Sequence, residues 1–359
     1  MVQLNQRMKR VISTFCVLVA FVMAFSSAAH ARIYENIVAF GDSLTDHYGL
    51  SSYLGVYDPD TNPNGVPEVW TNGDVWVEYL AADWGATLDN NAIGGAMSLG
   101  HENADIQALS DSGSLPQLGL VGQVDSFIST DPEFDEDETL FTIWIGGNDF
   151  LEFGRGESYT TDPEVLIAGM MNNISETVVS LYAQGADNFL IINLPDLGTV
   201  PAYNSKSAEE IAGTTALVQA YNTALATTIE SLESSFSDIS INLFDSFGFL
   251  TELIDTNAFA NVTGTYMELD TEGNRTGNVN GDADDYMFWD GIHPMTRVHE
   301  MMADELRATL YPDEDGGGSS SCFINSVQGT SSGSATPLIV LIVSFCLAAI
   351  AGIGLKQRN

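Results

Sequence analysis

The chain has 359 residues, of which 49 are acidic and 11 are basic, and its formal net charge is −38. An exterior this acidic repels polyanions, which disfavours nucleic acid and anionic membrane surfaces as partners. None of the three cysteines lies between Arg32 and Tyr311, so that part of the chain has neither a disulfide nor a cysteine-ligated metal site.

The first 31 residues have the pattern of a secretory signal peptide. A basic start over residues 7–10 precedes an apolar segment over Val11–Phe25, and small residues flank His30 as in a cleavage site. We expect the mature chain to begin at Arg32 and to leave the cytoplasm. An uncleaved membrane anchor is the disfavoured alternative, because the apolar segment is short for a membrane span.

Strand-like and helix-like patterns alternate after the leader. In chain order, they predict a strand over Ile33–Phe40, a helix over Val75–Trp84, a strand over Thr87–Ile93, a helix that includes Gln123–Ser129, a strand over Thr139–Ile145, a helix over Pro163–Gln184, a strand over Asn188–Leu194, a helix over Ser205–Phe236, a strand over Ile239–Phe244 and a helix over Met295–Tyr311. This alternation predicts one α/β domain over residues 32–312 with a mainly parallel sheet. Functional residues are then expected at the carboxyl ends of the strands.

A polar run over Asp270–Asp285 is dense in Asp, Asn and Gly. A calcium loop is one interpretation, but the spacing lacks the ligand pattern that ends in a bidentate glutamate. We therefore expect a plain solvated loop, with calcium as the alternative.

The composition changes after the last predicted helix. A Gly/Ser-rich linker spans residues 313–337, an apolar segment spans 338–355, and a basic tail follows over 356–359. The apolar segment is long enough for a transmembrane helix, with its basic end toward the cytoplasm. A processed C-terminal sorting signal is a second interpretation, and a buried core helix is disfavoured. We expect this helix to hold the protein at the membrane unless it is removed.

Ser43 lies where the first predicted strand ends. The apolar run from Ile37 stops at Gly41-Asp42, and the serine follows at once, which indicates a sharp turn. A serine held on such a turn can act as a nucleophile if a base, an orienting acid and oxyanion donors are supplied elsewhere.

One histidine has an acid at a useful distance. The four histidines after the leader are His47, His101, His293 and His299. Asp290 precedes His293 by three residues, so its carboxylate can accept the hydrogen of one ring nitrogen while the other nitrogen takes a serine proton. For such a pair alone, an ordinary surface turn is the alternative.

Acyl transfer also needs N–H groups aimed at the developing negative charge. Candidates are the backbone N–H of Ser43, the Gly94-Gly95 pair after the second strand, and the side-chain amide of Asn148 after the third strand. Each of the latter two motifs, taken alone, is also common turn chemistry.

Four blocks together resemble the GDSL family of lipases and esterases, also called SGNH hydrolases. They are Gly41-Asp42-Ser43-Leu44, Asn91-Ala92-Ile93-Gly94-Gly95-Ala96, Gly146-Gly147-Asn148-Asp149 and Asp290-Gly291-Ile292-His293-Pro294, in the family's order. The resemblance implies a flavodoxin-like three-layer α/β/α sandwich with a mainly parallel five-stranded sheet. It implies no cofactor and no metal.

The resemblance also implies roles for individual residues. Ser43 is the implied nucleophile, His293 the base and Asp290 the acid that orients it. The implied oxyanion donors are Ser43, Gly95 and Asn148, with Gly94 replacing Gly95 if the second block is displaced by one residue. Met295 departs from the family pattern, in which threonine often follows His-Pro, and leaves substrate preference open.

The chain is therefore expected to be a secreted or surface-anchored serine ester hydrolase with an ester or lipid substrate. Its subgroup resembles bacterial phospholipases, haemolysins and cholesterol acyltransferases, so acyl transfer to an alcohol is one alternative. A non-catalytic surface binding protein on the same scaffold is another. The sequence predicts no particular oligomeric state.

Overall fold

The structure is a computed structural model that describes residues 34–48, 70–271 and 273–310. The predicted signal peptide (1–31), linker (313–337), apolar segment (338–355) and basic tail (356–359) lie outside the described residues. Among the helices that the structure describes, none is long and apolar enough to cross a membrane.

A five-stranded sheet lies at the centre of the molecule, in the order β2-β1-β3-β4-β5 with every neighbouring pair parallel. Its strands are β1 (Asn36–Gly41), β2 (Thr87–Asn90), β3 (Thr139–Trp144), β4 (Asn188–Ile192) and β5 (Ser240–Phe244). The three central strands are almost wholly buried, as strands covered on both faces must be. The predicted parallel sheet is confirmed, and its strand order is flavodoxin-like.

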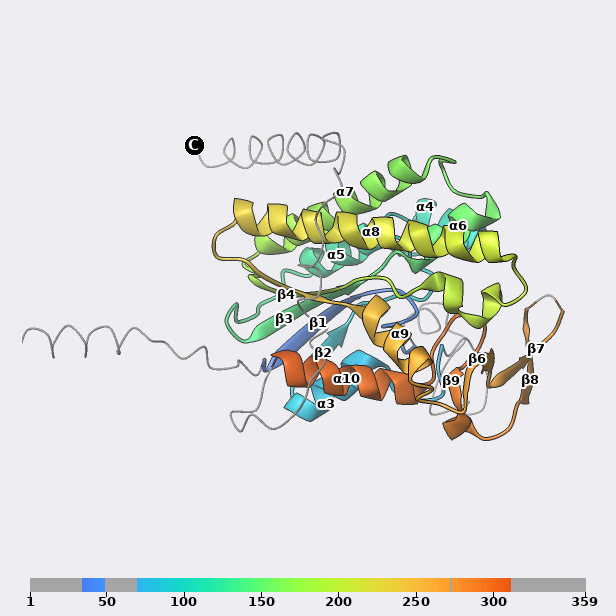
Figure 1. Ribbon diagram of the computed structural model, residues 1–359. Coiled ribbons are helices and arrows are strands. Elements are labelled where there is room, and N and C mark those ends of the chain that lie inside the picture. Colours follow the sequence, from blue (N-terminus) through green and yellow to red (C-terminus); the bar gives the residue numbers. More distant parts are fainter. Residues whose placement is uncertain (1–33, 49–69, 272, 311–359) are drawn as a thin grey trace, which may run out of the picture.

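Helices cover both faces of the sheet and complete three layers (Figure 1). The helices are α3 (Trp76–Trp84), α4 (Ala104–Asp111), α5 (Leu120–Ser129), α6 (Gly147–Arg155), α7 (Pro163–Tyr182), α8 (Ala208–Ser235), α9 (Ser246–Asp255) and α10 (Thr296–Leu310). Alternation along β1 sends Val38 and Phe40 into the core beneath α5, α7 and α8. It sends Ile37 and Ala39 into the second core, beneath α3, α9 and α10.

The five helices predicted from the sequence are all present. The pattern missed α4, α6 and α9, three short helices of eight to ten residues. In α6 the turn-forming start Gly147-Asn148-Asp149 also concealed the helix. Asn148 consequently lies in the first turn of a helix, directly beyond the end of β3.

The polar run near the C-terminal end is not the plain solvated loop that was expected. It contains β8 (Arg275–Val279), which pairs antiparallel with β7 (Met267–Leu269), and a short 3₁₀ turn. Next to this hairpin, β6 (Asn261–Thr265) pairs with β9 (Tyr286–Phe288). The turn between β7 and β8 closes with the Asn274 N–H donating to a carboxylate oxygen of Asp270 at 2.8 Å. Strand pairing here uses backbone groups, so polar composition did not reveal it.

Candidate active site

The end of β1 is held firmly just before Ser43. Gln123 of α5 accepts the Gly41 N–H at 3.0 Å and donates its amide to the Gly41 carbonyl at 2.8 Å. A Cβ atom at Gly41 would lie 2.4 Å from the carbonyl oxygen of Trp144 on β3, so only glycine fits here. These contacts fix the direction in which the chain leaves the sheet and presents the serine.

The turn itself is closed by its own backbone. The N–H groups of Thr45 and Asp46 donate to the Asp42 carbonyl at 3.0 and 2.8 Å. Burial raises the pKa of the Asp42 carboxyl to about 7, although the Leu44 N–H donates to it at 3.0 Å. The turn therefore carries a buried carboxyl group that stays protonated at pH values where an exposed aspartate is ionised.

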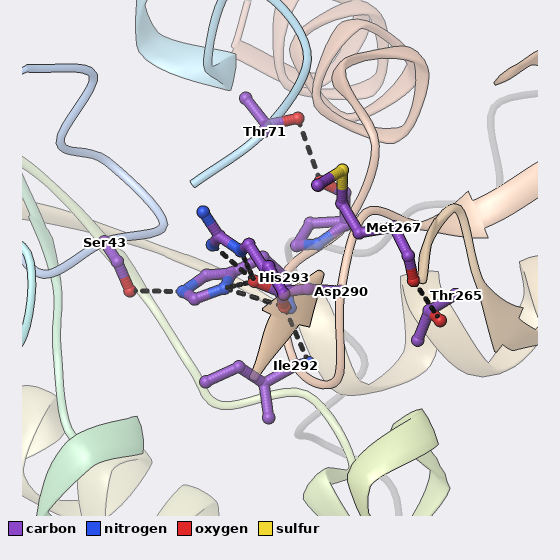
Figure 2. Close-up of polar contacts among 9 residues, drawn as sticks. Ser43, Thr71, Thr265, Met267, Asp290, Ile292 and His293 are labelled. Carbon is purple, nitrogen blue, oxygen red and sulfur yellow. Dashed lines mark hydrogen bonds and ion pairs between the residues drawn. The ribbon is translucent and has the colours of Figure 1, made fainter. Parts of the chain in front are cut away.

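Ser43, His293 and Asp290 form a hydrogen-bonded chain (Figure 2). The Nε2 atom of His293 lies 2.8 Å from the Ser43 hydroxyl oxygen, and its Nδ1 atom lies 2.9 Å from each carboxylate oxygen of Asp290. Because a carboxylate only accepts, Nδ1 carries the hydrogen and Nε2 can receive the serine proton. All three side chains are buried. The fold thus brings together the three residues to which the resemblance gave the nucleophile, base and acid roles.

The carboxylate of Asp290 is rigidly held and ionised. Burial opposes its ionisation, but His293 and Arg275 outweigh that effect and hold the pKa of Asp290 well below its usual range. The backbone N–H groups of Ile292 and His293 donate to Oδ1 at 3.0 and 2.9 Å. The acid and the histidine therefore form one compact turn.

The segment that precedes α3 fastens this turn in place. The Thr71 hydroxyl donates to the Pro294 carbonyl at 3.0 Å (Figure 2), and the side-chain oxygen of Asn72 accepts the Thr296 N–H at 3.0 Å. Met295, which departs from the family pattern, is buried. The histidine is therefore anchored by residues more than 200 positions away in the sequence.

Arg275 contacts the acid of this chain and was missed by the sequence reasoning. Its Nε and Nη2 atoms donate to Oδ2 of Asp290 at 3.1 and 2.5 Å. Its guanidinium carbon lies 5.9 Å from the ring centre of Trp70, and that ring lies 5.1 Å from the His293 ring. The one available signal was that Arg275 is the sole basic residue in the run 270–285. The polar run over 270–285 therefore reaches the site through β8.

Candidate oxyanion donors follow three neighbouring strands. Within the described residues, the backbone N–H groups of Ser43 and Gly95 have no hydrogen-bond acceptor. The Gly94 N–H, in contrast, donates to the Asp46 carboxylate at 2.6 Å, which favours Gly95 over Gly94 as the donor. The Asn148 amide donates one hydrogen to the Ala96 carbonyl at 2.9 Å and retains a second hydrogen.

Asp149 ties the loop after β2 to α6. Its carboxylate accepts from the backbone N–H of Ser98 at 2.9 Å and from the Ser98 hydroxyl at 2.7 Å. Burial raises the pKa of Asp149 to about 6, against the opposing effect of these two bonds. Asn148 and Asp149 thus both hold this loop, from the same turn of one helix.

A cavity of about 820 Å³ lies against the same loop. Its lining combines apolar residues such as Met97 and Leu166 with the acidic residues Asp149 and Glu152. A cavity of this size can hold a small organic group. Space for part of a ligand is therefore present beside the loop that carries Gly95.

Among the described residues, His47, Asp74 and Glu78 are close enough together to share a metal ion. Glu78, however, caps the start of α3 by accepting the Val75 N–H at 2.9 Å, and its other oxygen lies 2.8 Å from His47 Nδ1. The cap and this pair account for the positions of Glu78 and His47 without a metal. The described part of the run 270–285 contributes no comparable group.

Comparison with known proteins identifies the family. The family model described as GDSL-like Lipase/Acylhydrolase matches residues 37–306. The chain belongs to this family. The matched range contains all four blocks and every residue of the hydrogen-bonded chain, so the expected resemblance is confirmed.

Sequence identity to individual relatives is low. The chain is 29% identical to a thermolabile hemolysin of Vibrio parahaemolyticus over 292 residues, which cover 76% of this chain and 63% of the relative. It is 29% identical to a phosphatidylcholine-sterol acyltransferase of Aeromonas hydrophila over 202 residues, which cover 55% of each protein. The chain therefore spans less than two thirds of either relative. The solved structure of a carbohydrate esterase aligns over 81% of this chain and 71% of its own length, with 16% sequence identity and a TM-score of 0.40. A likeness this weak says nothing about activity.

Proposed function

We propose that this GDSL-family chain is a serine ester hydrolase acting on carboxylic esters, lipid esters included. The observation that carries the proposal is the position of His293, whose Nε2 atom lies 2.8 Å from the Ser43 hydroxyl while Asp290 holds Nδ1. A buried serine in contact with a correctly protonated imidazole is the arrangement that activates a weak nucleophile.

The first half of the proposed reaction forms an acyl-enzyme. The Ser43 oxygen attacks the ester carbonyl while its proton passes to Nε2 of His293, and Asp290 stabilises the resulting imidazolium. The carbonyl oxygen becomes an oxyanion that accepts hydrogen bonds from the N–H groups of Ser43 and Gly95 and from the Asn148 amide. Collapse of this intermediate breaks the bond to the alcohol, which leaves with the proton returned by His293.

The second half releases the acid. Water gives a proton to His293 and attacks the acyl carbonyl, and the same donors stabilise the second oxyanion. Collapse breaks the bond to Ser43 Oγ, which recovers its proton from His293. No metal or cofactor takes part in these steps.

The test compares the wild type with Ser43→Ala on a panel of esters from acetyl to long-chain acyl, phospholipids included. We expect hydrolysis by the wild type and a loss of at least about 10³-fold in the variant, because the nucleophile is absent. A fluorophosphonate probe should add to Ser43 of the wild type, as located by peptide mass. Equal rates in both proteins would refute the proposal, and a wild type that neither hydrolyses nor labels would point to a non-catalytic binding protein.

Acyl transfer to an alcohol is a second candidate, favoured by the relative named as a phosphatidylcholine-sterol acyltransferase. The acyl-enzyme is the same, and an alcohol then replaces water as the attacking group. Product analysis with phosphatidylcholine and either a sterol or glycerol distinguishes the two. A new ester indicates transfer, whereas free fatty acid alone indicates hydrolysis.

We also propose an extracytoplasmic location, supported by the leader-like pattern of residues 1–31. Retention at a membrane is proposed on the apolar pattern of residues 338–355. Cell fractionation combined with the intact mass of the native protein tests both, because loss of either segment changes the mass by a calculable amount.

A further inference from the structure

We propose that His101 is a positioning residue that holds the oxyanion hole in its working shape by fixing the peptide group between Gly94 and Gly95. The inference rests on the proposed ester hydrolysis, to which it adds a second histidine outside the Ser43–His293–Asp290 chain. His101 is 3% exposed, and neither the four blocks nor its spacing marks it out.

The hydrogen-bond partners of His101 determine its tautomer. The backbone N–H of Asn103 lies 3.0 Å from Nδ1, and because a backbone N–H only donates, Nδ1 is the acceptor. The Gly94 carbonyl oxygen lies 2.8 Å from Nε2, and because a carbonyl only accepts, Nε2 carries the hydrogen. The neutral imidazole with hydrogen on Nε2 satisfies both bonds, so the ring is locked in one orientation.

The bond to Gly94 acts on Gly95 through the peptide plane. The Gly94 carbonyl and the Gly95 N–H belong to one planar trans peptide group and point in opposite directions. By holding the carbonyl on one side, His101 aims the N–H to the other side. Within the described residues that N–H has no acceptor, as a donor reserved for a substrate oxyanion should have none.

Without such a restraint, this peptide would be unusually free to rotate. Glycines flank it on both sides, and Gly95 has φ +77°, a conformation that other residues rarely adopt. Asp46 accepts the Gly94 N–H at 2.6 Å, and the Gly95 carbonyl accepts the Glu102 N–H at 2.9 Å. These two bonds restrain the neighbouring peptides, and His101 alone among the described residues bonds to the peptide that carries the donor.

The packing supports the same role. A Cβ atom at Gly95 would lie 2.7 Å from Cε1 and 2.8 Å from Nε2 of His101, so the ring sits directly against the glycine. A hydrogen bond to the carbonyl also polarises the peptide and strengthens its N–H as a donor. Both effects are felt most when the oxygen carries negative charge, which is in the transition state rather than in bound substrate.

The experiment replaces His101 in three ways. His101→Phe keeps a ring of similar size without polar atoms, and His101→Leu removes both the ring and the bonds. His101→Gln restores one donor and one acceptor, because the two polar atoms of its amide are about as far apart as the two ring nitrogens. Glu102→Gln is the matched control, since it alters a neighbouring side chain but keeps the backbone N–H that bonds to Gly95.

Each protein is titrated with the fluorophosphonate, so that rates refer to folded active sites. We expect kcat to fall by about 10- to 100-fold in the Phe and Leu variants, while KM changes by less than about threefold. This fall is smaller than the loss expected for deleting an oxyanion donor, because the donor is displaced rather than removed. The kcat of the Gln variant and of the Glu102 control should stay within about threefold of the wild-type value. The inhibition constant of an alkyl boronic acid, which adds to Ser43 as a tetrahedral anion, should rise by the same factor as kcat/KM falls.

Two results would overturn the inference. One is that kcat per active site in both His101→Phe and His101→Leu equals that of the wild type. The other is a fall in kcat with an unchanged boronic acid constant, which would assign His101 a purely structural role. In both cases the wild type still hydrolyses esters and labels at Ser43, so failure here is distinguishable from failure of the proposed function.

Discussion

Arg275 offers a quantitative test of how charge is distributed in the site. Replacing it with glutamine removes a positive charge that donates two hydrogen bonds to Oδ2 of Asp290. Asp290 keeps its bonds to the N–H groups of Ile292 and His293, so the carboxylate should stay in place. The substitution therefore changes the electrostatics of the site more than its geometry.

The size of the effect follows from the distances. Arg275 Nη2 lies 2.5 Å from Oδ2 of Asp290, and that oxygen lies 2.9 Å from Nδ1 of His293, so the two nitrogens are at most about 5.4 Å apart. Two unit charges at this distance repel by about 3 kcal/mol at an effective dielectric of 20. The arginine side chain is 22% exposed, so water screens part of this repulsion, and about 1.5 kcal/mol is expected.

This repulsion disfavours the imidazolium form of His293. Removing it stabilises the imidazolium that the proposed reaction forms at His293, and 1.5 kcal/mol corresponds to about a tenfold change in rate. The kcat/KM of Arg275→Gln should therefore be up to about tenfold above that of the wild type, because the imidazolium forms in the transition state. The free energy of unfolding should fall by about 1–2 kcal/mol, less than for a fully buried pair.

The assay is kcat/KM for a soluble ester at one fixed pH, with urea unfolding in parallel. Arg275→Lys retains the charge without the paired hydrogen bonds and should give a smaller change in kcat/KM. Arg297→Gln removes an exposed arginine that pairs with Glu300, and should leave kcat/KM unchanged. A kcat/KM that stays the same or falls in Arg275→Gln would refute the electrostatic reasoning.

Two further predictions concern other parts of the site. Burial raises the pKa of Asp42 to about 7. Between about pH 5 and 7 the carboxyl group is therefore protonated in the folded protein but ionised in the unfolded chain. The free energy of unfolding of the wild type then falls as the pH rises through this range. The side chain of Asp42→Asn does not titrate, so its free energy of unfolding, measured with urea, should increase relative to the wild type by about 2–3 kcal/mol between pH 5 and 8. If the two proteins instead show the same dependence of unfolding free energy on pH, the assigned effect of burial is wrong. Asn148→Ala should lower kcat by about 10²–10³-fold with little change in KM, because the amide acts on the oxyanion, and a variant of unchanged kcat would remove Asn148 from the oxyanion hole.

Much of the site was predictable because its signals are local. Asp290 and His293 are three residues apart, so their pairing needs one turn of chain. Ser43 and Asn148 each follow a buried strand, Gly95 follows the edge strand β2, and parallel strands place their carboxyl ends at one edge of the sheet. Strand pattern and short motifs therefore sufficed to expect these residues together.

The contacts that tune the site depend on tertiary structure. Arg275 lies in a polar run that suggested only a loop, and it reaches Asp290 because backbone pairing folds that run into a hairpin. Gly95 is favoured over Gly94 as an oxyanion donor because the Gly94 N–H already donates to a carboxylate. That carboxylate belongs to Asp46, which lies in a different turn of the chain.

The amino-acid sequence by itself determined the five strands of the central sheet, the order of the blocks and the residue types that the chemistry needs. Only the tertiary structure decided which polar groups are paired and which are not, as the bonds of Gln123 and His101 illustrate. The physical reason is that periodicity reports which face of an element is buried. A hydrogen bond between side chain and backbone across the fold leaves no periodic trace in the sequence.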